Sequence, residues 1–193
     1  MSDRGHPIAM APSETATRYV AFIRNVMIGR AGLHADVLLE FFDGASAQET
    51  RSHLAAGNVS FISRESSLEG IIDAAQRGIH LTMGRFEPVF ARWLDALRRA
   101  VRANHFAEVP IVEVHDRCVT FIELLGGQLT VPMHSARGDA VIFAQNGHDI
   151  YSATHLINGR GGNPNRMIEK ELSCRATTRN WNTVERIVKL FDD

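Results

Sequence analysis

The stretch Tyr19-Val-Ala-Phe-Ile23 is an uninterrupted apolar run that follows a polar N-terminal segment. An apolar run of this length with little alternation is typical of a strand buried on both faces. Residues 25–32 follow as a loop, and residues 33–42 then place apolar side chains at helical spacing before Gly44. The sequence therefore predicts a central strand followed by a helix.

A hairpin is predicted next, because residues 49–54 and 59–63 flank a turn that contains Gly57-Asn58. Gly and Asn both tolerate the positive φ angles of tight turns. Ser66 or Ser67 is then expected to cap a second helix, and Glu69, three residues after Ser66, completes a capping box.

A fourth strand is expected over residues 86–91, at a sheet edge because Pro88 interrupts it. The resulting order, β-α-β-β-α-β, is that of the ferredoxin-like split βαβ unit, in which two helices cover one face of an antiparallel sheet. We therefore predict a ferredoxin-like subdomain over residues 18–91. Residues 1–17 have no apolar core and are expected to form a disordered N-terminal tail.

The second half, residues 92–193, is predicted to form another α+β subdomain that ends in the C-terminal helix. Its expected elements are a helix over 92–104 with Trp93 facing inward, a strand over 118–124, a hairpin of 140–144 with 149–153, a helix from Pro164 capped by Asn163, and a last helix capped by Asn182.

The composition excludes several classes of protein. Of 193 residues, 45% are hydrophobic and 22% are charged, and the net charge of −1 lacks the strong basicity of most nucleic-acid binders. Two cysteines and nine histidines show no metal-ligand spacing, so we expect no metal and no cofactor. No apolar run is long enough to cross a membrane, and the two thiols favour a cytoplasmic protein.

The most distinctive segment is Ala176-Thr-Thr-Arg-Asn-Trp-Asn-Thr183, which places hydroxyl, guanidinium and amide groups before the last helix. A helix N-terminus with a nearby arginine can bind an anion. We therefore predict a site for a small anionic ligand, built from Arg24, Asn58, Thr178, Arg179, Asn180 and Asn182. The alternative is that these residues cap and turn the chain while Trp181 packs in the core.

These segments resemble the bacterial domain-of-unknown-function family 1697. All eight residues from 176 to 183 fit its closing motif, Tyr19–Arg24 resembles its opening strand, and Gly57-Asn58-Val59 with Phe61 resembles its hairpin. The resemblance implies two ferredoxin-like subdomains packed together, with antiparallel sheets and helices on one face. It implies no reaction, so whether the protein is an enzyme stays open.

Two further functions are compatible with the sequence. The arginine-rich helix could bind nucleic acid through Arg92, Arg98, Arg99 and Arg102. Alternatively, the protein is a scaffold that acts without catalysis, as a monomer or a homodimer.

Overall fold

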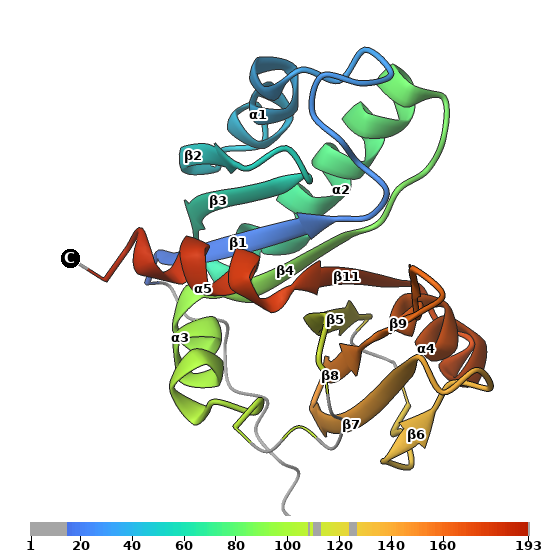
Figure 1. Ribbon diagram of the computed structural model, residues 1–193. Helices are drawn as coiled ribbons and strands as arrows, with labels where there is room; N and C mark the ends of the chain where they lie inside the picture. The colour runs from blue at the N-terminus through green and yellow to red at the C-terminus, as the bar shows by residue number, and fades with distance from the viewer. Residues whose placement is uncertain (1–14, 108, 110–112, 124–126, 193) are drawn as a thin grey trace, which may run out of the picture.

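The computed structural model describes residues 15–107, 109, 113–123 and 127–192, and it divides into two halves that each contain an antiparallel sheet (Figure 1). The first half consists of β1 (Thr17–Ile23), α1 (Ala35–Asp43), β2 (Gln48–His53), β3 (Asn58–Ser63), α2 (Glu65–Met83) and β4 (Val89–Trp93). Its strands lie in the order β2-β3-β1-β4. The ferredoxin-like prediction for this half is confirmed.

The second half repeats this arrangement of strands. Its elements are α3 (Leu94–Ala103), β5 (Asp116–Ile122), β6 (Met133–His134), β7 (Ala140–Asn146), β8 (Asp149–Thr154), β9 (Leu156–Ile157), β10 (Arg160–Gly161), α4 (Pro164–Leu172), β11 (Ala176–Asn180) and α5 (Trp181–Lys189). The sheet order is β11-β5-β8-β7-β6, so β5, β7, β8 and β11 match β1, β2, β3 and β4. Where the first half has α1, the described residues 127–139 contain only β6.

The two faces of β1 serve different cores. Tyr19, Ala21 and Ile23 pack against α1 and α2, while Val20 and Phe22 face the second half of the molecule. The second core also contains side chains of β5 and β8, and α3 and α5 pack against each other beside it. Figure 1 shows these two helices at the boundary between the halves. The alternation of side chains along one buried strand thus joins the two halves.

Two predicted helix boundaries are wrong. Arg92 and Trp93 belong to β4, because Trp93 pairs with Tyr19 of β1, and the Trp93 side chain is 43% exposed rather than inward. The helix α2 begins at Glu65, two residues after Ser63 pairs with Thr17, so Ser66 and Ser67 both lie inside the helix and neither is its N-cap.

The segment at 176–180 is also a strand rather than a capping turn, because it pairs with β5. Asn180, not Asn182, is the N-cap of α5, and its side-chain oxygen accepts the Asn182 N–H at 3.0 Å. Of the predicted N-terminal tail, residues 1–14 lie outside the described residues, whereas Thr17 already belongs to β1.

Candidate functional site

Arg179 is one of two buried residues among the predicted site residues, with 8% of its surface exposed against 0% for Asn58. Its Nε donates to Asn58 Oδ1 at 2.7 Å, its Nη1 to Thr177 Oγ1 at 2.8 Å, and its Nη2 to the Ile23 carbonyl at 2.7 Å and the Ala56 carbonyl at 2.9 Å. Burial lowers the pKa of the guanidinium to about 10, which leaves it charged at neutral pH. All these acceptors are neutral oxygens of the same chain.

Arg92 makes the corresponding contacts from the first half to the second. It lies in β4 of the first half, and its Nε donates to Asp149 Oδ1 of the second half at 2.6 Å. Its Nη2 donates to the carbonyls of Ile122 and His148 at 3.1 and 2.9 Å. Each arginine therefore binds the end of the central strand and the hairpin turn of the other half. We call these two sets of contacts the arginine clamps.

The register of the sheets makes the clamps equivalent. Asn58 is opposite Phe22 in the first sheet, and Asp149 is opposite Phe121 in the second. The two phenylalanine rings stack at a centroid distance of 4.1 Å, with Arg179 over Phe22 and Arg92 over Phe121. The halves are thus related by an approximate two-fold axis that passes between the stacked rings.

The other predicted ligand residues lie near these clamps but make separate contacts. Arg24 binds Glu169 of α4 and the Ala176 carbonyl. Thr178 bonds with Thr120 and Asn165, Asn180 with Asp116, and Asn182 with Arg117. The structure brings Asn58 and Arg179 into direct contact and places the remaining side chains around the start of β11 and α5. That they bind an anion stays a prediction.

The predicted nucleic-acid residues divide into three groups. Arg92 belongs to a clamp and not to the helix. Arg98 pairs with Asp95 and Asp192, both at 2.8 Å, and these contacts raise its pKa. Arg99 and Arg102 are exposed, and neither makes an ion pair or hydrogen bond with the described part of the chain.

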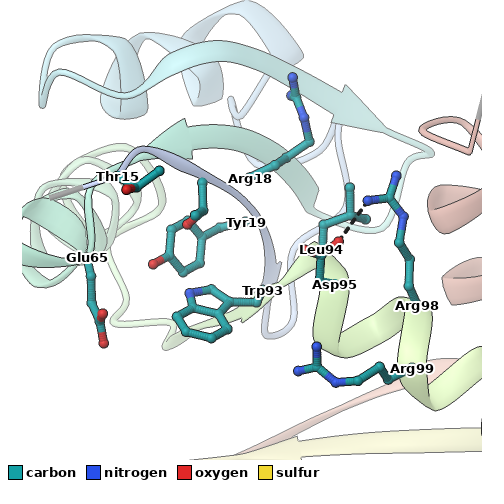
Figure 2. A pocket seen from close by; sticks show the side chains of 10 residues that line it. Thr15, Arg18, Tyr19, Glu65, Trp93, Leu94, Asp95, Arg98 and Arg99 are labelled. Atoms are coloured by element: carbon teal, nitrogen blue, oxygen red, sulfur yellow. Dashed lines mark hydrogen bonds and ion pairs between the residues drawn. The ribbon is translucent and has the colours of Figure 1, made fainter. Parts of the chain in front are cut away.

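A hollow of about 320 Å³ opens where β1 begins and β4 passes into α3. Figure 2 shows Tyr19 and Trp93 side by side in it, with Glu65 on one side and Arg98 and Arg99 on the other. The Tyr19 and Trp93 rings are tilted at a centroid distance of 6.4 Å, and Tyr19 also stacks on Phe61. The exposed Trp93 ring and the buried Tyr19 ring form one aromatic wall.

The Tyr19 hydroxyl is an unusual polar group of this hollow. The residue is only 2% exposed, and its Oη has no hydrogen-bond partner among the described residues. In Figure 2 the hydroxyl points toward the space between Thr15 and Glu65. A buried hydroxyl without a partner is costly, and such groups are rare unless water or a ligand completes them.

Two helices also begin at this hollow. Glu65 is the first residue of α2 and Leu94 the first of α3, and neither N-cap residue, Arg64 or Trp93, caps its helix with a side chain. Main-chain N–H groups at uncapped helix starts attract anions. The sequence did not reveal this hollow, because the helical spacing of Leu94, Leu97 and Val101 concealed the strand ending at Trp93.

Among the described residues, no group of three or more His, Cys, Asp or Glu side chains is arranged to hold a metal ion. Over the same residues, no helix has the length and apolar character needed to span a membrane.

Comparison with known proteins gives a family and a fold. A family model described as "Protein of unknown function (DUF1697)" matches residues 16–146. The conserved bacterial protein SP0830 from Streptococcus pneumoniae has a similar structure, with a TM-score of 0.64 and 13% sequence identity over 93% of this chain and 100% of that one. At this identity the likeness concerns the fold alone. No curated protein matches the chain.

The matched residues include the opening strand and the first hairpin, whereas residues 176–183 lie beyond them. The match nevertheless covers more than half of the 193 residues. The chain therefore belongs to the family of proteins of unknown function DUF1697.

Proposed function

We propose that this protein binds a small ligand that combines a planar ring with an anionic group, in the hollow between Tyr19 and Trp93. The observation that carries the proposal is the buried Tyr19 hydroxyl, which has no hydrogen-bond partner among the described residues and lies in a hollow walled by an exposed tryptophan. A planar ring would cover Trp93, and a polar atom of the ligand would bond with Tyr19 Oη.

The charges around the hollow favour one anionic group and not several. Arg18, Arg98 and Arg99 line it together with Glu65 and Asp95. Arg18 pairs with Glu49, and Arg98 pairs with Asp95, so Arg99 is the arginine with a charge to offer. Together with the start of α3, Arg99 would hold a phosphate or a carboxylate.

Calorimetry and tryptophan fluorescence with defined compounds test the proposal. The compounds are adenosine monophosphate and phenyl phosphate, with adenosine and inorganic phosphate as the separate halves. We expect a ring-bearing phosphate to bind and to quench Trp93, while the buried Trp181 gives the unchanged background signal. Trp93→Ala and Arg99→Ala should each weaken binding about tenfold, since stacking and a charged hydrogen bond contribute that much.

Arg102→Ala is the matched control, because Arg102 lies on the same helix outside the hollow. It should bind the same compound within about twofold of the original protein. Equal affinity in the Trp93→Ala and original proteins would overturn the site. Failure of every compound to bind at millimolar concentration would overturn the ligand class.

Nucleic-acid binding is the second candidate function, favoured by the exposed Arg99 and Arg102. Three hollows surround α3, and Arg99 lines all of them. A single strand would stack a base on Trp93 and place phosphates along the two arginines. In that case Arg102→Ala weakens binding of an oligonucleotide but not of adenosine monophosphate, and the affinity falls steeply with salt.

We also propose a cytoplasmic location, supported by the two cysteines, neither of which forms a disulfide. The state of assembly, monomer or homodimer, stays a prediction that light scattering over a concentration series tests.

A further inference from the structure

A groove of about 620 Å³ lies between α2 and β4, near the end of β5. Leu68 and Ile72 of α2 and Phe90 of β4 give it an apolar lining, and the carboxylates of Glu69 and Glu123 lie at its rim. Both glutamates are exposed, and neither has an ion-pair partner in the described part of the chain. The groove adjoins the Trp93 hollow at Glu65 but has a different lining and the opposite charge.

The approximate two-fold axis relates this groove to an equivalent position in the second half, between α4 and β11. Ile23 and Ile122 end the two central strands and donate their N–H groups to the carbonyls of Gly57 and His148. Arg24 therefore corresponds to Glu123. Likewise, Val89 donates its N–H to Gln76 Oε1 of α2 at 3.2 Å, as Ala176 donates to Glu169 Oε1 of α4 at 3.2 Å.

In the second half, this equivalent position is occupied by Arg24 of the same chain. The Arg24 guanidinium lies between α4 and β11, where Nε donates to Glu169 Oε1 at 3.0 Å and to the Ala176 carbonyl at 3.1 Å. In the first half the corresponding residue is Glu123, which carries the opposite charge. The groove therefore lies beside the equivalent position, where the first half has Glu123 in place of Arg24 and Gln76 in place of Glu169.

We propose that this groove binds an arginine or lysine side chain from an extended basic segment of a partner protein. The cation lies between Glu69 and Glu123, and the apolar lining covers its aliphatic stem and the neighbouring side chains of the segment. Recognition is by side chains and not by strand addition, because Gln76 already accepts the Val89 N–H and Arg92 already donates to the Ala91 carbonyl.

Fluorescence anisotropy with a labelled peptide tests this inference. The probe is acetyl-Arg-Val-Arg-Val-Arg-Val-amide, compared with the same peptide in which Glu replaces Arg. We expect the basic peptide to bind and the acidic one not to. Glu123→Arg reverses the charge at the position equivalent to Arg24 and places a long cationic side chain beside the groove, so it should weaken peptide binding by about tenfold or more.

Glu171→Arg on α4 is the matched control, because it makes the same change of charge at an exposed position outside the groove. It should bind the basic peptide within about twofold of the original protein. If Glu123→Arg unfolds, as judged by circular dichroism, the doubly neutral variant Glu69→Gln with Glu123→Gln serves instead. Equal binding in the groove variant and the original protein would overturn the site.

Two other outcomes would also overturn the inference. Equal binding of both peptides would show that charge does not select the occupant. Binding of spermidine as tight as that of the basic peptide would show a site for small cations and not for a protein segment. Neither result affects the Trp93 hollow, whose test uses anionic compounds and different variants.

Discussion

Arg92 and Arg179 occupy equivalent places in the two halves, yet their surroundings differ. Arg92 has a side chain that is 12% exposed and an acidic partner, Asp149. Arg179 is more deeply buried and has an amide partner, Asn58, among neutral oxygens. Both arginines bind the last carbonyl of the opposite central strand. The fold therefore specifies an arginine at this place, while the charge of its partner can vary.

A buried cation without a carboxylate is stable only if its hydrogen bonds replace the lost hydration. Arg179 meets that condition through acceptors on both halves. The comparison indicates that the segment around residue 179 joins the halves as one core. It also gives four predictions about stability, here ordered from the largest expected effect to the smallest.

Arg179→Ala should lower the free energy of unfolding by about 3–4 kcal/mol, because it removes the guanidinium and leaves buried carbonyls of both halves unpaired. Urea denaturation measures this effect. Arg186→Ala, an exposed arginine on α5, is the control and should change stability by less than about 0.5 kcal/mol. A loss at Arg179 as small as that at Arg186 would show that the clamp is dispensable.

Arg92→Ala should cost less, about 2–3 kcal/mol, because water can reach the partly exposed Asp149 and the freed carbonyls. The same denaturation experiment applies. A larger loss for Arg92→Ala than for Arg179→Ala would reverse the comparison of the two clamps.

Asp149→Asn makes the Arg92 clamp resemble the Arg179 clamp, with an amide oxygen accepting from Arg92 Nε. We expect a loss of about 1 kcal/mol, because the hydrogen bond remains and only its ionic contribution goes. A loss as large as that of Arg92→Ala would mean that the Asp149 charge, and not the geometry, holds this clamp.

The smallest expected effect concerns His53, whose pKa is lowered by burial and by the nearby charges of Arg51 and Arg18. As pH falls through about 6.5, the unfolded chain takes up a proton at this position before the folded chain does, so stability decreases. Urea midpoints between pH 7.5 and 5 should fall less steeply for His53→Gln. An identical slope in both proteins would remove His53 from this pH dependence.

Local patterns predicted many of these elements correctly. The apolar run at residues 19–23 is the buried β1, and the two predicted hairpins, 49–54 with 59–63 and 140–144 with 149–153, are β2 with β3 and β7 with β8. Asn163 caps α4 ahead of Pro164, with its side chain accepting the Arg166 N–H. Burial of an apolar strand and the φ angles of a turn depend on neighbouring residues, so the sequence shows them directly.

The predictions failed where distant pairing overrides local preference. Residues 176–180 are mostly polar and form a strand only because β5 lies beside them. Pairing with Tyr19 likewise extends β4 to Trp93. The Trp93 hollow went unpredicted for the same reason, since it depends on where β4 ends and α3 begins.

The sequence by itself therefore determined the family, the strands of the first half, the strands β5, β7 and β8 of the second half, and most of the turns. Only the tertiary structure decided what the arginines do. Arg24, Arg92 and Arg179 look alike in the sequence, and each is a possible anion ligand there. Folding gives each of them oxygen atoms from the opposite half, because the approximate two-fold packing brings the ends of the central strands against the last strand of the other sheet.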